Sequence, residues 1–258
     1  MPKRLLVVGS TGLPGLEGDV LPCDRASTPP PCDVAVLLGD PERRGDHEEL
    51  LGRNLGWVRA AAAAVARTSP DCALIVAARP VNTLALAALQ AGRLRREKVL
   101  GVAGLADELR LSGLVGKALG VDAGDVRAAV LGGCGESLVA LPRLWSVGGI
   151  PAGELLSCQD IEGLRRAACA GAGPDELAAA AALLAGALLG GARRLCTASV
   201  LLEGEYGVDG LCLAVPVVLG PGGWERIVQL NLNVAERAAL LKAAAAGRAL
   251  RETLEVSQ

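Results

Sequence analysis

The stretch CALIVAARPVNTLALAALQAG, residues 72–92, places an unbroken apolar run directly before a leucine- and alanine-rich segment. A run without polar positions, such as residues 72–78, is typical of a strand that is buried on both faces of a parallel sheet. Residues 81–92 consist largely of good helix formers, so we predict a helix there. A buried strand followed at once by a helix is the first part of a β-α-β unit.

Three similar apolar runs flank this stretch, at residues 4–10, 33–39 and 98–104. Between the second run and residue 72, leucines recur at helical spacing, acidic residues come before them, and Pro70 closes the segment. These features predict another helix. The resulting order of strands and helices is typical of an open α/β sheet with right-handed crossovers.

The pattern changes after Gly104. We expect a helix over about 106–119, then shorter strands, an alanine-rich helix near 175–190, three antiparallel strands between residues 197 and 230, and a long terminal helix. The change of pattern predicts two domains, residues 1–104 and 105–258.

Composition excludes several classes of function. The chain has 26 Lys and Arg against 28 Asp and Glu, and they are interspersed, whereas nucleic-acid binding needs a clustered basic face. The longest uncharged run, residues 177–192, is shorter than the ~20 residues of a membrane span. The amino end has no apolar stretch long enough for a signal peptide. We therefore expect a cytoplasmic protein that binds neither nucleic acid nor membrane.

The eight cysteines show no Cys-x-x-Cys spacing, and the chain has a single histidine, His47. Most of the cysteines fall inside apolar runs, so we interpret them as small core residues in a reducing compartment. Because no Cys and His cluster exists in the sequence, we predict no metal site.

Cys134 is different, because it lies in the stretch VLGGCGESLVAL, residues 130–141. Glycines on both sides of it indicate a sharp backbone turn that a ligand can approach. Cys134 is therefore a candidate functional residue.

The amino end contains a weak glycine motif. Gly9, Gly12 and Gly15 follow the first apolar run at intervals of three, as in a phosphate-binding turn. The prolines that follow, at 14, 22 and 29–31, exclude a crossover helix of normal length. A plain loop is the alternative interpretation.

The order of motifs resembles that of the lactate/malate dehydrogenase family, with the malate dehydrogenase branch nearest. The segments that carry the resemblance run from about residue 33 to the carboxyl end; they include HEELLGRNLGWVRAAAAAVARTSPDCALIVAARPVNTLALAAL, VLGVAGLADELRL, AVLGGCGESLVAL, GIPAGELL and LLEGEYGVDGLCLAVPVVLG. The resemblance implies an α/β fold. We expect a truncated Rossmann-like parallel sheet in residues 1–104, with the second and third strands missing, followed by an α+β domain of the family's carboxyl-terminal type in residues 105–258.

Without those two strands, the first strand is expected to be an exposed edge of the sheet. Natural proteins usually cover such an edge. The proline-rich residues 22–32, or a partner, would then supply the cover.

The resemblance assigns catalytic roles to two positions. Cys134 stands where the family has the histidine that is its general acid and base. Asp107, in GLADELR, matches the aspartate that orients this histidine. A thiol with a pKa of ~8.5 is a poorer acid than histidine, and a neighbouring carboxylate disfavours its thiolate further.

Substrate-binding positions follow from the same motifs. Arg110 matches the arginine that grips the substrate carboxylate. Arg79 replaces the asparagine that binds the substrate oxygen. Arg43 or Arg44 stands for the first arginine of the mobile loop, and the second falls near His47, with a gap of one residue.

Three hypotheses follow. The first is a catalytically degenerate malate dehydrogenase-like protein with a structural or regulatory role. It would be a homodimer or tetramer, or a heteromer with an intact paralogue, and would use no cofactor unless the shortened turn still binds NAD. The second is an active NAD(P)-dependent oxidoreductase on a 2-hydroxy or 2-oxo (di)carboxylic acid. The third is a sensor that binds a small carboxylate, a dicarboxylate, at Arg110 and Arg79 without chemistry.

Overall fold

The computed structural model describes residues 3–9, 13, 20–23, 28–39, 45–191 and 193–256. The helices are α1 (His47–Thr68), α2 (Val81–Gly92), α3 (Ala103–Leu119), α4 (Ala152–Leu155), α5 (Cys158–Ala168), α6 (Pro174–Gly190) and α7 (Val234–Val256). The strands are β1 (Leu5–Val8), β2 (Val20–Cys23), β3 (Val34–Leu38), β4 (Ala73–Ala77), β5 (Val99–Gly101), β6 (Val126–Arg127), β7 (Val130–Gly132), β8 (Leu138–Ala140), β9 (Ser146–Val147), β10 (Ile150–Pro151), β11 (Arg194–Glu203), β12 (Asp209–Gly220) and β13 (Gly223–Ile227).

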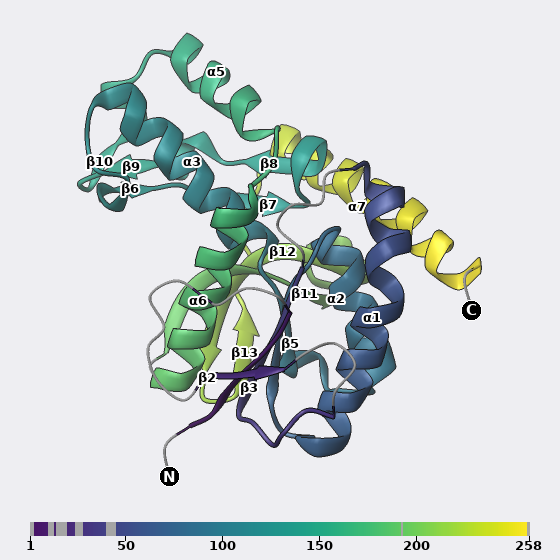
Figure 1. The fold of residues 1–258 in the computed structure, drawn as a ribbon. Coiled ribbons are helices and arrows are strands. Elements are labelled where there is room, and N and C mark those ends of the chain that lie inside the picture. Colours follow the sequence, from purple (N-terminus) through teal and green to yellow (C-terminus); the bar gives the residue numbers. More distant parts are fainter. Residues whose placement is uncertain are drawn as a thin grey trace.

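A single large sheet forms the centre of the protein (Figure 1). Its strands follow the order β2-β1-β3-β4-β5-β11-β12-β7-β8, and β13 pairs with β12. The pairs from β2 to β5 are parallel, and β12 is antiparallel to both β11 and β13. A smaller three-stranded sheet contains β10, β9 and β6.

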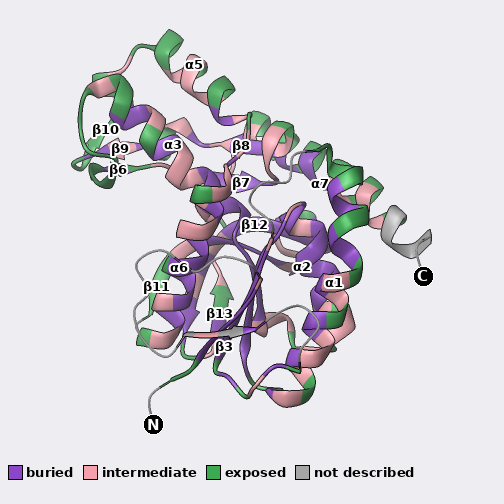
Figure 2. Ribbon diagram, viewed as in Figure 1, coloured by how far each residue is buried: buried purple, intermediate pink, exposed green. Residues whose placement is uncertain are grey.

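Alternate residues of the parallel strands enter two different cores. Val34 and Val36 of β3 share one core with α6, whereas Ala35 and Leu37 share the other with α1 and α2. Successive side chains of a strand point to opposite faces, so a strand that is covered on both faces has no polar position. Figure 2 shows these central strands buried between the helices. This two-sided cover explains the unbroken apolar runs of the sequence.

The predicted elements of the first half are confirmed with small shifts at their ends. The helix over 81–92 matches α2, and the runs at 33–39 and 72–78 contain β3 and β4. The helix expected over 106–119 begins earlier, at Ala103. The three antiparallel strands expected near the carboxyl end are β11, β12 and β13.

The expectation that the first strand is an edge of the sheet is wrong. Strand β2 pairs in parallel with β1 along its whole length, from Leu5–Val20 to Val8–Cys23. Strand β2 is therefore the edge of the sheet, and it supplies the cover that was expected from residues 22–32, although it overlaps that segment only at Pro22 and Cys23. Pro22 lies in this strand, and an edge strand tolerates a residue without an N–H group.

The central sheet continues across residue 104. Gly101 of β5 pairs with Ser199 of β11, and α3 lies directly over β11. A Cβ atom at Gly104 would stand 2.3 Å from the Thr197 side chain, so the close packing of α3 on β11 requires glycine at this position. The boundary at residue 104 stays a prediction. Among the described helices, none has the length and apolarity needed to span a membrane.

Candidate functional site

A cavity of about 70 Å³ lies beyond the carboxyl end of β4. Open α/β sheets bind their ligands outside the carboxyl ends of the strands. The cavity is small compared with the 300–1,000 Å³ of drug-sized pockets, so it suits a ligand of few atoms. Its lining residues come from five segments of the chain: His47, Arg79, Ala103, Asp107, Cys134, Gly135, Ala170, Gly171, Ala172 and Leu177.

Asp107 contributes a buried carboxyl group from α3. The residue is 1% exposed. Its Oδ1 accepts a hydrogen bond from the N–H of Ala172 at 3.1 Å, and its Oδ2 is buried without a partner. Burial raises the pKa of Asp107 to about 7, although the bond from Ala172 and the charges of Arg110 and Arg79 act against the rise. This carboxyl therefore exchanges a proton near neutral pH.

Cys134 lies between β7 and a short 3-10 turn at Gly135–Ser137. The turn is sharp, since Gly132 and Gly135 have φ values of 88° and 65°. A Cβ atom at Gly132 would stand 2.7 Å from the Ser137 carbonyl oxygen. Burial, and next the charge of Asp107, raise the pKa of Cys134 to about 12. At neutral pH the residue is a neutral thiol, in agreement with the sequence argument.

Arg79 follows β4 and is held through its backbone. Its carbonyl accepts a hydrogen bond from Asn54 Nδ2 at 2.7 Å, and Asn54 Oδ1 accepts one from Trp57 Nε1 at 2.9 Å. The positive charge of Arg79 opposes the rise in pKa of both Asp107 and Cys134. The guanidinium therefore acts on both groups across the cavity.

A second asparagine joins the Arg79 segment to the Cys134 segment. Asn82 Nδ2 donates to the Gly132 carbonyl at 3.2 Å, and its Oδ1 accepts a hydrogen bond from the Ser199 hydroxyl. Through these bonds the start of α2 is fixed to both β7 and β11.

Arg110 lies one turn beyond Asp107 but, in the described part of the chain, does not line the cavity. Its Nη2 donates to the Ala167 carbonyl at 3.4 Å, and its Nε is buried without a partner. Its charge lowers the pKa of Asp107. Arg110 faces the carboxyl end of α5 in this structure.

His47 is the first residue of α1, and it lines the cavity from an exposed position. Asp46 caps the amino end of α1, because its side chain accepts a hydrogen bond from the Glu49 N–H at 2.9 Å. Arg43 and Arg44 lie outside the described residues, as do Gly12 and Gly15.

Gly9 is the described residue of the glycine motif. It follows β1 with a φ of 145°. A Cβ atom there would stand 2.5 Å from the Leu38 carbonyl oxygen. A side chain does not fit at this position, because the backbone at the carboxyl end of β1 packs closely against the end of β3.

The sequence analysis missed two contributors to this site. One is Asn54, a polar residue in the apolar stripe of α1 that includes Leu50 and Val58, at positions four residues before and after it. A polar residue on a buried helix face could have revealed this role. The other is the N–H of Ala172, for which the sequence offers no signal.

Comparisons with known proteins agree with the geometry. Residues 25–101 match the lactate/malate dehydrogenase NAD binding domain, and residues 165–255 match the lactate/malate dehydrogenase alpha/beta C-terminal domain. The malate dehydrogenase of Parabacteroides distasonis is 32% identical over 267 residues, which is 98% of this chain and 85% of that protein. The chain belongs to the lactate/malate dehydrogenase family. The resemblance found in the sequence is therefore confirmed at the level of the family.

Other members of the lactate/malate dehydrogenase family give the same result. The malate dehydrogenase of Symbiobacterium thermophilum is 34% identical, with 86% of this chain and 74% of that protein covered. The solved structure of malate dehydrogenase from Aeropyrum pernix is 27% identical with a TM-score of 0.85, over 97% of this chain and 90% of that one. Malate dehydrogenase from Salinibacter ruber is 25% identical with a TM-score of 0.86, over 98% of this chain and 97% of that one. An NAD-binding domain is thus present, followed by the family's carboxyl-terminal domain.

Proposed function

We propose that the chain is an active NAD(P)-dependent oxidoreductase that acts on a small 2-hydroxy or 2-oxo (di)carboxylic acid. The proposal rests on one observation: Asp107, an acid with a pKa near neutrality, and the Arg79 guanidinium line the same small cavity. Titratable groups with shifted pKa values in a cleft are characteristic of functional sites. This site provides both a proton and a positive charge.

Arg79 binds and polarises the substrate in this proposal. A guanidinium donates paired hydrogen bonds to a carboxylate or to a carbonyl oxygen. When the carbonyl becomes an alkoxide, the fixed positive charge stabilises the alkoxide. A single group of this kind raises kcat by a factor of about 10²–10³. The bond from Asn54 to the Arg79 carbonyl fixes the backbone from which this side chain extends.

Asp107 holds the proton that the alkoxide receives. A general acid works best when its pKa is near the working pH, and the pKa of Asp107 is about 7. Its Oδ2 is buried and has no partner in the described structure, so the hydrogen-bonding capacity of this oxygen is unused until a substrate binds. The Cys134 thiol, with a pKa of about 12, remains protonated and does not compete for this role.

NAD(H) or NADP(H) would lie at the carboxyl ends of β1 and β3. There it would supply or accept the hydride. Gly9, which follows β1, is the described residue of the proposed phosphate-binding turn. Gly12 and Gly15 belong to the same proposed turn. The segment between β1 and β3 is shorter than the two strands and two helices that the resemblance implies there, so we also propose weakened contacts to the adenosine half.

The resemblance further implies a dimer through α1 and α3. The outer face of α1 supports this, because small residues occur there at intervals of four, at Gly52, Gly56 and Ala60, and all three are exposed. A Cβ atom at Gly52 or Gly56 would meet nothing within 4 Å. Gly56→Arg should shift the protein from dimer to monomer in light scattering, whereas Arg67→Ala, at the far end of α1, should not. A wild-type monomer would contradict the proposal.

Cys134 favours a second candidate function, a catalytically degenerate homologue that acts as a structural or regulatory subunit. A neutral thiol stands where the resemblance places a histidine. In such a chain, the wild type would show no turnover, and Cys134→His would gain it. Binding of malate, oxaloacetate or citrate without turnover would indicate a dicarboxylate sensor instead.

Steady-state assays test the proposed activity. NADH or NADPH is supplied with oxaloacetate, pyruvate or 2-oxoglutarate, and cofactor oxidation is followed. We expect saturable turnover with at least one pair. Arg79→Ala should lower kcat/KM by about 10²–10³, and the exposed Arg67→Ala should leave it unchanged. A folded protein without turnover for any pair would contradict the proposal.

A further inference from the structure

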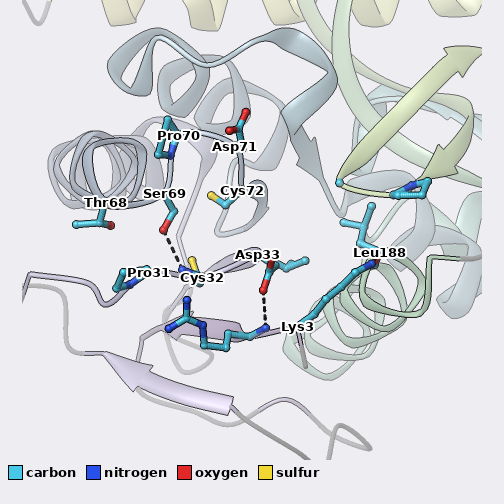
Figure 3. Close-up of a pocket in the computed structure, with 14 residues that line it drawn as sticks. Lys3, Pro31, Cys32, Asp33, Thr68, Ser69, Pro70, Asp71, Cys72 and Leu188 are labelled. Carbon is cyan, nitrogen blue, oxygen red and sulfur yellow. Dashed lines mark hydrogen bonds between the residues drawn. The ribbon is translucent and has the colours of Figure 1, made fainter. Parts of the chain in front are cut away.

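A second pocket lies at the other end of the parallel strands from the candidate site. It has a volume of about 280 Å³ and lies beside the amino ends of β3 and β4 (Figure 3). Two cysteines, Cys32 and Cys72, line this pocket together with Lys3 and Arg4. Neither thiol has a role in the proposed oxidoreductase chemistry.

A single residue, Ser69, holds both cysteines in place. The Cys32 N–H donates to Ser69 Oγ at 2.9 Å, a bond drawn in Figure 3. The Cys72 N–H donates to the Ser69 carbonyl at 3.1 Å. Both cysteines are therefore fixed to the turn that follows α1, although forty positions separate them in the sequence.

The two side chains lie on the same face of the sheet. Cys72 alternates with Leu74 and Val76, and all three belong to the core beneath α1 and α2. The chain bends at Asp33, just before β3, and Cys32 joins this same core. Without the bend, strand alternation would place Cys32 on the opposite face, with Val34.

The strand register places the two backbones at a separation that a disulfide can span. Val34 pairs with Ala73, so Cys32 and Cys72 stand on neighbouring strand ends, offset by one residue. Spacings of about 4.8 Å between strands and 3.3 Å along a strand give a Cα separation of about 6 Å. Disulfides span Cα separations of about 4.4–6.8 Å.

The surroundings make the two thiols unequal. Interaction with the Cys72 thiol, followed by the Ser69 hydroxyl and the charge of Arg4, lowers the pKa of Cys32. Interaction with Cys32, together with burial, raises the pKa of Cys72. Cys32 is also the more exposed, at 9% against 2%. Cys32 is thus the thiol that reacts first, and Cys72 is the thiol that then attacks the disulfide formed on Cys32.

We propose that Cys32 and Cys72 form a reactive dithiol that closes reversibly to a disulfide by exchange with a small disulfide compound in this pocket. The Cys32 thiolate attacks one sulfur of the compound R–S–S–R, forms Cys32–S–S–R, and displaces one thiolate, which takes up a proton. Cys72 loses its proton to solvent and attacks the Cys32 sulfur, and the second R–S⁻ leaves and is protonated. The two cysteines are oxidised, and the compound is reduced to two thiols.

The charged side chains of the pocket balance one another. Lys3, Arg4, Asp33 and Asp71 line it and all four are exposed. The pocket would therefore admit a small disulfide compound that carries both positive and negative groups. This inference does not depend on the proposed oxidoreductase function, because the dithiol lies at the amino ends of the strands.

Oxidised glutathione is the probe that tests the proposal. The full-length protein is equilibrated in glutathione buffers from fully reduced to fully oxidised, alkylated and digested with trypsin. Cleavage after Arg25, Arg43, Arg67 and Arg93 gives peptides 26–43 and 68–93, which contain one cysteine each. We expect a linked pair, lighter by two hydrogen atoms than the two reduced peptides, which disappears when reducing agent is added.

Three variants sharpen this test. Cys32→Ser and Cys72→Ala should each lose the link, and Cys72→Ala should retain one glutathione on Cys32. Cys158→Ser removes an exposed cysteine elsewhere and should leave the link unchanged. If peptides 26–43 and 68–93 of the wild type are recovered only as separate peptides, reduced or each joined to glutathione, the proposal is wrong. That result is readable even if a variant fails to fold.

Discussion

One oxygen of the Asp107 carboxyl group accepts a hydrogen bond from the Ala172 N–H at 3.1 Å, and the other oxygen is buried without a partner in the described structure. The bond joins α3 to the turn between α5 and α6, sixty-five positions away. A half-satisfied buried carboxyl reduces stability. Its presence at the wall of a cavity is what a proton-donating site requires and what a purely structural site would avoid.

Replacement of this carboxyl should stabilise the protein above neutral pH. The native state keeps the Asp107 proton up to a pH of about 7, whereas the unfolded chain releases it near pH 4. Between these values the native state binds more protons, so the free energy of unfolding falls as pH rises. Asp107→Asn removes this loss, which is about 4 kcal/mol for three pKa units.

Denaturant unfolding at pH 5 and pH 8 measures the effect. Asp107→Asn should gain stability over the wild type at pH 8, and the gain should shrink at pH 5. Asp209→Asn, an exposed control, should change neither value. A variant that loses stability equally at both pH values would show that the carboxylate is compensated in the native state.

The same proton should control the rate of reduction. The reduction of a 2-oxo acid needs Asp107 in its protonated form, so kcat/KM should fall as pH rises through about 7. Asp107→Asn should lower kcat/KM by a factor of about 10²–10⁴. Measurement of kcat/KM between pH 5 and 9 gives the profile. A flat profile across this range in the wild type would exclude Asp107 as the donor.

Asn54 should be important for stability as well as for the site. Asn54→Leu removes the hydrogen bond to the Arg79 carbonyl. A buried polar group that loses its hydrogen bond costs about 1–3 kcal/mol. We expect the free energy of unfolding to fall by an amount in this range, in thermal or denaturant unfolding, and we expect a higher KM. Wild-type stability in the variant would show that water replaces the amide.

Local pattern was enough to predict most of the fold. Strands β3 and β4 and helix α2 were predictable because each is buried on both faces or consists of good helix formers. Strand β2 was not predicted, because four residues that include Pro22 read as a loop. Its position depends on pairing with β1, a contact that the local sequence does not encode.

The candidate site was predictable only in part. The family's motif order pointed to Arg79, Asp107 and Cys134, and the cavity brings all three together. The bond between Asp107 and Ala172 depends on how two distant segments pack, so no local pattern predicts it. Cys32 and Cys72 were interpreted as independent core residues, since only the parallel register of β3 and β4 places them side by side.

The most direct test of the proposed function is the transfer of deuterium from cofactor to product. The protein is incubated with a 2-oxo acid and with NADH that carries deuterium at C4 of the nicotinamide, and the product is analysed by mass spectrometry. The account predicts a 2-hydroxy acid with one deuterium at carbon 2, and a much lower yield with Arg79→Ala. If the folded wild-type protein forms no labelled 2-hydroxy acid from any 2-oxo acid tested, with either NADH or NADPH, the chain is not an oxidoreductase of this kind.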